Sequence, residues 1–366
     1  MKWRLDMARE PLFTFIFCVY NRPNFTRLAL EAIMGQTYKN LEIIIVNNGG
    51  TPEVVEYVLK AQASDNRIKI LHHKENQFSL DDHALIYRVC ISPALMTATG
   101  EYVYLHFDDD LLSNDYAEKM VALFLGNPDC TSAAGLPKRI NATGEIISPE
   151  ARTNNYRPRY MPGHLLVLST FCTNSRFLYG IMFSAPGVIF SFHRETLIKA
   201  GGYNVCIEQS QLYGIVPFGV TGYDETAIAY CRIHAGRTSA YLNRLGWTSS
   251  RYIVNFVKDW QIEERWKVFG EDVAKYVVEN IVNNTFEDDT LWFVVNFYFF
   301  RFKACVYAFR MMWFRSYFWK RLPVLLWIEK RQFKYFMKPH IRRIFESQVW
   351  LQKVPALSWL KEKAFK

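Results

Sequence analysis

Three consecutive carboxylates, Asp108, Asp109 and Asp110, follow directly on the apolar run EYVYLHF at 101–107. That run supplies no compensating cation, so we expect the three side chains to need a positive partner. A divalent metal ion meets this need, because Mg²⁺ and Mn²⁺ prefer one or two carboxylates together with phosphate oxygens. The alternative is a solvated acidic turn that caps the next helix, expected over 113–125. The sequence therefore makes 108–110 a candidate metal site.

Short apolar runs alternate with segments of helical periodicity through the first third of the chain. The runs predict buried strands over 12–20, 41–50, 67–73 and 101–107, and the periodic segments predict helices over 25–38, 51–63, 82–98 and 113–125. This alternation is typical of an α/β fold, a Rossmann-like and mostly parallel sheet flanked by helices.

Ligands of such sheets bind beyond the carboxyl ends of the strands. Polar residues stand at three of these ends, namely Tyr20-Asn21-Arg22, Asn47-Asn48-Gly49-Gly50 and the aspartates 108–110. We expect the three groups to converge on one site.

The positive charge of the chain is concentrated at its end. Residues 291–366 contain 16 basic and three acidic side chains, whereas residues 1–290 contain 28 basic and 32 acidic ones. Aromatic residues alternate with the cations, which favours amphipathic helices that bind an anionic membrane surface. A helical subdomain packed on the body is the alternative, and nucleic-acid binding is disfavoured because no such motif accompanies the segment. We expect a main domain over 1–250 and a C-terminal helical region over 251–366, whose basic amphipathic tail starts near 291.

Several classes of protein are excluded. The N-terminus lacks the apolar stretch of a secretory signal, and no window reaches the length of a membrane span, so a cytoplasmic location is expected. The seven cysteines form no CxxC pair, and neither GxGxxG nor GxxxxGK[ST] occurs, which argues against zinc modules, dinucleotide oxidoreductases and P-loop NTPases.

Four segments in order resemble the inverting glycosyltransferases of family 2, whose nucleotide-sugar-binding fold is called GT-A. They are YNRP at 20–23, GQTYKNLEIIIV with NNGGT at 35–51, ATGEYVYLHFDDDLLSNDY at 98–116 and SFHRETLIKAGGYN at 191–204. The resemblance covers about residues 10–245. It implies the GT-A fold and a nucleoside-diphosphate sugar of the UDP, dTDP or GDP type as donor.

The resemblance also implies roles for the residues at the strand ends. The metal, Mn²⁺ or Mg²⁺, would be held by two of the three aspartates, with their register open by one, and His234 could contact metal or diphosphate. Where the family usually has Asp, this chain has Asn, which leaves the nucleotide base open. The implied nucleotide-binding residues are Tyr20, Asn21, Arg22, Asn47, Asn48, Asp108 and Asp109.

Displacing a nucleoside diphosphate with inversion requires a base for the acceptor hydroxyl as well as an electrophile for the leaving group. By the resemblance, Asp224 would be this base, just before a helix, with Glu225 the next candidate. His193 and Arg194 could touch the acceptor. A helix N-cap is the alternative role for Asp224.

The resemblance thus implies a metal-dependent inverting glycosyltransferase for surface polysaccharide such as lipopolysaccharide. It would act on a glycan or lipid-linked glycan acceptor and sit peripherally on the inner face of the cell membrane. A nucleotidyltransferase on a similar sheet, or a non-catalytic membrane-surface or partner-binding protein that keeps the fold, are the alternatives.

Overall fold

The computed structural model describes residues 9–79, 82, 85–147, 159–171, 190–203, 213–237, 261–279 and 281. The chain divides into two compact units, one of 1–240 with 252–281 and one of 241–251 with 282–366. All described residues belong to the first unit. The predicted basic tail from 291 lies outside them, and the boundary at 250 stays a prediction.

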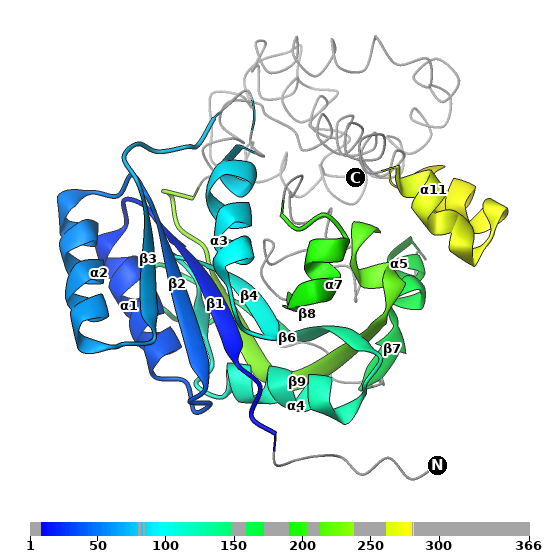
Figure 1. Cartoon of the computed structure of the whole chain (residues 1–366), viewed down its shortest axis with the longest axis horizontal. Coiled ribbons are helices and arrows are strands. Elements are labelled where there is room, and N and C mark those ends of the chain that lie inside the picture. The colour runs from blue at the N-terminus through cyan, green and yellow to red at the C-terminus, as the bar shows by residue number, and fades with distance from the viewer. Residues whose placement is uncertain are drawn as a thin grey trace, which may run out of the picture. The chain divides into compact units, whose positions relative to one another are not determined.

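A nine-stranded sheet organises this unit, with the order β3-β2-β1-β4-β8-β6-β9-β5 and β7 paired to β9 (Figure 1). Its first four strands are parallel. Their bounds are β1 (Phe13–Val19), β2 (Leu41–Asn48), β3 (Ile68–His73) and β4 (Tyr102–Phe107). The predicted α/β sheet is therefore confirmed, and the four predicted strands match to within two residues at either end.

Helices cover both faces of the parallel strands. The chain steps outward from β1 to β3 through α1 (Pro23–Met34) and α2 (Pro52–Ser64), then returns to β4 through the π-helix η1 (Tyr87–Ile91) and α3 (Ser92–Thr97). Right-handed crossovers in opposite directions place α1 and α2 on one face and α3 on the other, as Figure 1 shows.

The second half of the sheet is mixed. Strand β8 (Phe190–His193) runs antiparallel to both β4 and β6 (Cys130–Ile140), whereas β6 runs parallel to β9 (Val220–Arg232). The short strands β5 (Leu111–Leu112) and β7 (Tyr160–Pro162) pair antiparallel with β9. The remaining elements are α4 (Tyr116–Gly126), α5 (Gly163–Phe171), α7 (Arg194–Lys199), η2 (Val216–Phe218), α11 (Ile262–Trp266) and η3 (Lys267–Phe269). Among the described residues, no helix combines the length and the apolar character needed to cross a bilayer.

The core follows from the apolar runs, because every residue of β1 and β2 is buried. Glu42 is the charged exception. Its carboxylate accepts hydrogen bonds from Thr14 Oγ1 (2.6 Å), Thr99 N (2.8 Å), Thr99 Oγ1 (2.9 Å) and Lys69 Nζ (2.6 Å). Burial raises the pKa of Glu42, but these four donors outweigh it and lower the pKa to about 2. The ionised carboxylate thus ties β1, β2, β3 and the segment before β4 together.

The predicted helix after Asp224 is wrong, because Asp224 lies inside strand β9. From Ala227 to Cys231 the burial alternates, with Ala227, Ala229 and Cys231 buried and the residues between them partly exposed. A period of two is the burial pattern of a strand. A bulge between Asp224 and Ile228 shifts the register against β6 and interrupts this alternation. The alternating pattern of the strand could therefore not be recognised in the sequence.

Candidate functional site

The aspartates follow β4, and the neighbouring strand β1 brings Tyr20 and Arg22 to them. In the register of these two strands Cys18 lies opposite Phe107, so the next residues of both chains meet at the carboxyl edge. Asp108 Oδ2 accepts a hydrogen bond from Tyr20 N at 3.3 Å. The expected convergence of 20–22 with 108–110 is therefore observed.

Arg22 pairs with the first two aspartates. Its Nη1 donates to Asp108 Oδ1 at 2.6 Å and lies 3.6 Å from Asp109 Oδ2. Its Nη2 donates to Gly236 O at 3.1 Å. One guanidinium thus links the end of β1, the aspartate turn and the segment after β9.

His234, just beyond β9, also reaches this turn. Its Nε2 lies 3.1 Å from Asp109 Oδ2, and its ring packs edge-to-face on Phe25 with centroids 4.9 Å apart. The predicted proximity of His234 to the aspartates is therefore observed. Strand β9 delivers it because β9 runs parallel to β6 and ends at the same edge as β4.

Arg232 is a member of the site that the sequence reasoning missed. It is 1% exposed, and its backbone N–H donates to Asp110 Oδ1 at 2.9 Å. Its guanidinium donates to the carbonyls of Asp109 (2.9 Å), Asn141 (3.2 Å) and Ala142 (3.1 Å), and its Cζ lies 4.7 Å from the Phe25 ring centroid. A correct strand assignment for 220–232 would have pointed to it, since an arginine at a strand end can face the ligand edge.

The electrostatics of the turn differ from one aspartate to the next. Burial raises the pKa of Asp108 to about 6, with Asp109 adding to the increase and Arg22 opposing it. Burial also acts to raise the pKa of Asp109, but the hydrogen bond from His234 and the charge of Arg22 outweigh it, so that pKa is lowered. Burial lowers the pKa of the fully buried His106 to about 4. Its neutral ring therefore donates from Nε2 to the carbonyl of Asp110 at 3.2 Å.

The two asparagines at the end of β2 are buried and engaged within the chain. Asn47 Oδ1 accepts from Gly50 N at 2.7 Å, and its amide lies 3.0 Å from His72 Nδ1. Asn48 Oδ1 accepts from Gln77 N at 2.8 Å, and its Nδ2 donates to Asn76 Oδ1 at 2.8 Å. These bonds shape the loops after β2 and β3, and a role in base recognition stays a prediction.

The structure does not bring Asp224 and Glu225 to the aspartates. Asp224 pairs with Gly135 and Arg232 with Ile140, so five residue steps of β6, about 17 Å at ~3.3 Å each, separate Asp224 from the end of β9 that reaches the aspartates. Asp224 Oδ1 instead accepts from Thr226 N at 2.9 Å and from Thr226 Oγ1 at 2.5 Å.

His193 and Arg194 also lie at the opposite edge of the sheet. Because β8 is antiparallel to β4, His193 pairs with Tyr102, the first residue of β4, whereas the aspartates follow its last residue. Arg194 N donates to Glu101 O at 2.8 Å. The acceptor role predicted for these two residues thus has no support from proximity to the aspartate turn.

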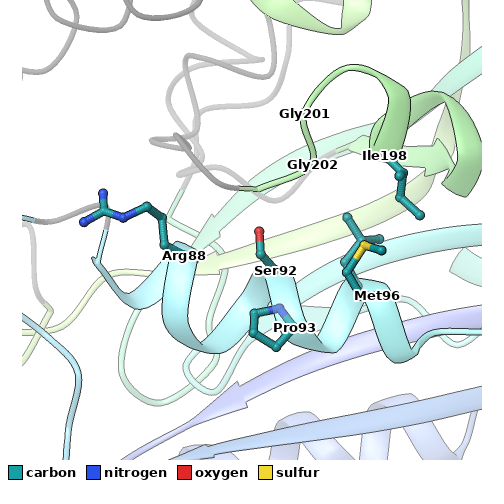
Figure 2. A pocket seen from close by; sticks show the side chains of 8 residues that line it. Arg88, Ser92, Pro93, Met96, Ile198, Gly201 and Gly202 are labelled. Atoms are coloured by element: carbon teal, nitrogen blue, oxygen red, sulfur yellow. The ribbon is translucent and has the colours of Figure 1, made fainter.

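A pocket of about 330 Å³ opens beside the aspartate turn. Its lining is Asn21, Arg22, Pro23, Asn24, Phe25, His234 and Gly236. Figure 2 shows a second pocket, of about 400 Å³, between α3 and the turn after α7, and it contains none of the predicted site residues. In the described part of the chain, no three His, Cys, Asp or Glu side chains are grouped as a complete metal site.

Comparison with known proteins identifies the N-terminal part. Residues 14–82 match the family described as Glycosyl transferase family 2. An uncharacterized glycosyltransferase of Haemophilus influenzae is 29% identical over 126 residues, which are 34% of this chain and 36% of that protein. The putative glycosyltransferase EpsH of Bacillus subtilis is 32% identical over 114 residues, 30% of each chain. The matched region thus spans about a third of the length of these relatives.

A solved structure extends the likeness to the fold. The structure of S. aureus TarS 1–349 in complex with UDP-GlcNAc superimposes with a TM-score of 0.56 at 15% identity, covering 75% of this chain and 72% of that one. The match confirms the GT-A fold expected from the sequence. By residues 14–82 and these relatives, the N-terminal part of the chain is similar to glycosyl transferase family 2, and the fold of the chain is similar to that of TarS.

Proposed function

We propose that the protein is a metal-dependent, inverting glycosyltransferase that moves a sugar from a nucleoside-diphosphate donor to a glycan acceptor. The observation that carries this proposal is the meeting of Asp108, Asp109, Arg22 and His234 at the carboxyl edge of β1, β4 and β9. This edge is where α/β sheets bind nucleotides. The family match and the nucleotide sugar named for TarS support the donor class.

The donor atoms at this edge fit a divalent ion in their chemistry. Asp108 Oδ1 and Asp109 Oδ2 lie 2.6 and 3.6 Å from a single atom, Arg22 Nη1, so two carboxylate oxygens already share one cation. Carboxylates suit both Mg²⁺ and Mn²⁺, so the aspartate pair fits either ion. When bound there, the ion would offset the charge that develops on the departing diphosphate.

The residues of the chain then have separate tasks. Asp108 and Asp109 would hold the ion, and Arg22 would supply a fork of donors for phosphate oxygens. The pocket of about 330 Å³ beside Arg22 gives room for part of the donor. Asp224 as general base stays a prediction, and its distance along β9 from the aspartate turn disfavours it.

A thermal-shift panel tests the proposal. UDP, GDP and dTDP are each added with and without Mn²⁺ to the wild-type chain, to Asp108→Asn and to the exposed control Asp129→Asn. A ligand at a hundredfold excess over its Kd adds about 2.7 kcal/mol to the stability of the native state, so binding raises the midpoint. We expect one nucleotide to raise the unfolding midpoint of the wild type and of Asp129→Asn, and to do so only when Mn²⁺ is present. The same nucleotide should leave the midpoint of Asp108→Asn unchanged. No shift with any of them would contradict the proposal.

Product analysis then tests the reaction itself. Turnover of the matching nucleotide sugar should give a product of inverted anomeric configuration by NMR. Full turnover by an Asp224→Asn variant would show that Asp224 is not the base. A product of retained anomeric configuration would contradict the inverting mechanism.

The proposal includes a location, the cytoplasmic face of the cell membrane, where a lipid-linked acceptor of surface polysaccharide synthesis would be met. Its basis is the excess of 16 basic over three acidic side chains in residues 291–366. We expect the whole chain to co-sediment with vesicles of phosphatidylglycerol and to be released by salt. Equal binding to phosphatidylcholine vesicles, or none to either, would contradict this part.

A further inference from the structure

Arg22 and a divalent ion compete for the same oxygens. The guanidinium stands within 2.6 Å of Asp108 Oδ1 and 3.6 Å of Asp109 Oδ2, and its own side chain is 20% exposed. Asp108 and Asp109 are 4% and 15% exposed, so little water is present to screen a second positive charge. An ion bound to the two carboxylates beside an unmoved Arg22 would place two cations in contact in a poorly solvated site.

We propose that Arg22 is an exchangeable counter-ion, which occupies the aspartate pair until a divalent ion replaces it and then binds the diphosphate of the donor. This inference rests on the proposed function and concerns the order in which ligands occupy the same site. It makes the binding of metal ion and nucleotide interdependent.

The surroundings of Arg22 allow the exchange. Its backbone is fixed at the start of α1, where Thr26 N donates to Arg22 O at 2.8 Å, so only the side chain has to move. A pocket of about 330 Å³ is lined by Arg22 together with Asn21 and Asn24, and none of the three aspartates lines it. A guanidinium that turns into this pocket meets phosphate oxygens with a planar fork of donors.

The exchange has a thermodynamic consequence. A divalent ion that binds alone must displace Arg22 and leave that cation without a partner anion, which weakens its binding. A diphosphate supplies the missing anion, so each ligand raises the affinity of the other by the same factor. Removing the guanidinium should therefore strengthen the binding of Mn²⁺ alone and weaken the coupling to nucleotide.

Mn²⁺ binding provides a readout that needs no catalysis. Free Mn²⁺ is measured by electron paramagnetic resonance during titration of the whole chain, first alone and then with UDP, GDP or dTDP. The variants are Arg22→Gln, Arg22→Lys and the control Arg27→Gln, whose arginine sits on the exposed side of α1 beside Glu31. Thermal unfolding of each variant confirms that it is folded.

We expect Arg22→Gln to bind Mn²⁺ alone about ten- to a hundredfold more tightly than the wild type, the range set by a hydrogen bond between charged groups. Arg22→Lys keeps the charge and should stay near the wild type, as should Arg27→Gln. An unchanged or weaker affinity in Arg22→Gln would overturn the inference. An equal gain in Mn²⁺ affinity in Arg22→Gln and Arg22→Lys would also overturn it. Both variants lose the bond to Gly236 but only Arg22→Gln loses the positive charge, so an equal gain could not come from the charge.

The two proposals fail in different ways. If Arg22→Gln gains no Mn²⁺ affinity while the wild type binds Mn²⁺ with a nucleotide, the exchange is wrong and the proposed function stands. If neither chain binds Mn²⁺ with any of the three nucleotides, both are wrong.

Discussion

Replacement of Arg232 by Met is expected to destabilise the fold and to loosen the aspartate turn. The guanidinium is buried and donates to the backbone carbonyls of Asp109, Asn141 and Ala142 at 2.9 to 3.2 Å. Met fills a similar volume and keeps the apolar contact, but it donates no hydrogen bond. The three carbonyls would then be left without this donor.

The size of the effect follows from these bonds. A buried polar group that loses its partner costs about 1–3 kcal/mol, and Nη1 divides its bond between two of the three carbonyls. Burial lowers the pKa of Arg232, which means that part of the loss is recovered when the buried charge is removed. We therefore expect a net decrease of about 2–4 kcal/mol in the free energy of unfolding.

Urea unfolding at neutral pH measures this difference, with Arg27→Met as the matched control. Arg27 is half exposed and pairs with Glu31 on the surface of α1, so its replacement should change the stability by no more than about 0.5 kcal/mol. A loss below about 1 kcal/mol in Arg232→Met, or an equal loss in the control, would refute the view that Arg232 fixes this turn.

Three further substitutions are expected to change stability in different directions. Glu42 has a pKa of about 2 when folded and 4.5 as its ordinary value, so its contribution of about 3 kcal/mol is complete above pH 4.5 and is lost as the pH falls towards 2. The free energies of unfolding of the wild type and of Glu42→Gln should differ at pH 7, and this difference should become smaller as the pH falls to 2. A difference that stays constant over this range would contradict the prediction. Asn48→Ala should cost about 1–3 kcal/mol and speed hydrogen exchange at Gln77 N, and unaltered exchange there would speak against the role of Asn48. Asp108→Asn should stabilise the ligand-free chain by up to about 3 kcal/mol at pH 7, because the pKa of about 6 means that stability falls as the pH rises from 3.8 through 6. A less stable Asp108→Asn chain in urea at pH 7 would contradict this.

The half of the site on β1 and β4 could be predicted from the sequence. Both strands are continuous apolar runs, and such runs separated by helices are typical of parallel neighbours whose carboxyl ends meet. Tyr20, Arg22 and the aspartates were therefore expected at one edge, where the structure places them. The crossover rule that puts α3 opposite α1 and α2 depends only on strand order.

The other half could not be predicted, because hydrophobic periodicity carries no information on strand direction. Strand β8 is antiparallel to β4, which sends His193 to the edge opposite the aspartates. Strand β9 is interrupted by a bulge after Asp224, so the sequence there resembles the start of a helix with an acidic cap. Both errors concern which edge of the sheet a residue reaches, and only tertiary pairing decides that.

The partners of the three aspartates could not be predicted from the sequence either. Three adjacent carboxylates indicated a metal ion because their own strand offers no cation. The chain instead supplies the guanidinium of Arg22 from 86 residues upstream, and the backbone N–H of Arg232 and the ring of His234 from 122 and 125 residues downstream. Asp110 is turned to the backbone N–H of Arg232, whereas Asp108 and Asp109 share Arg22. Under the proposed function this division favours Asp108 and Asp109 as the metal-binding pair, because both face the cation Arg22, whereas Asp110 is bonded to the backbone of Arg232.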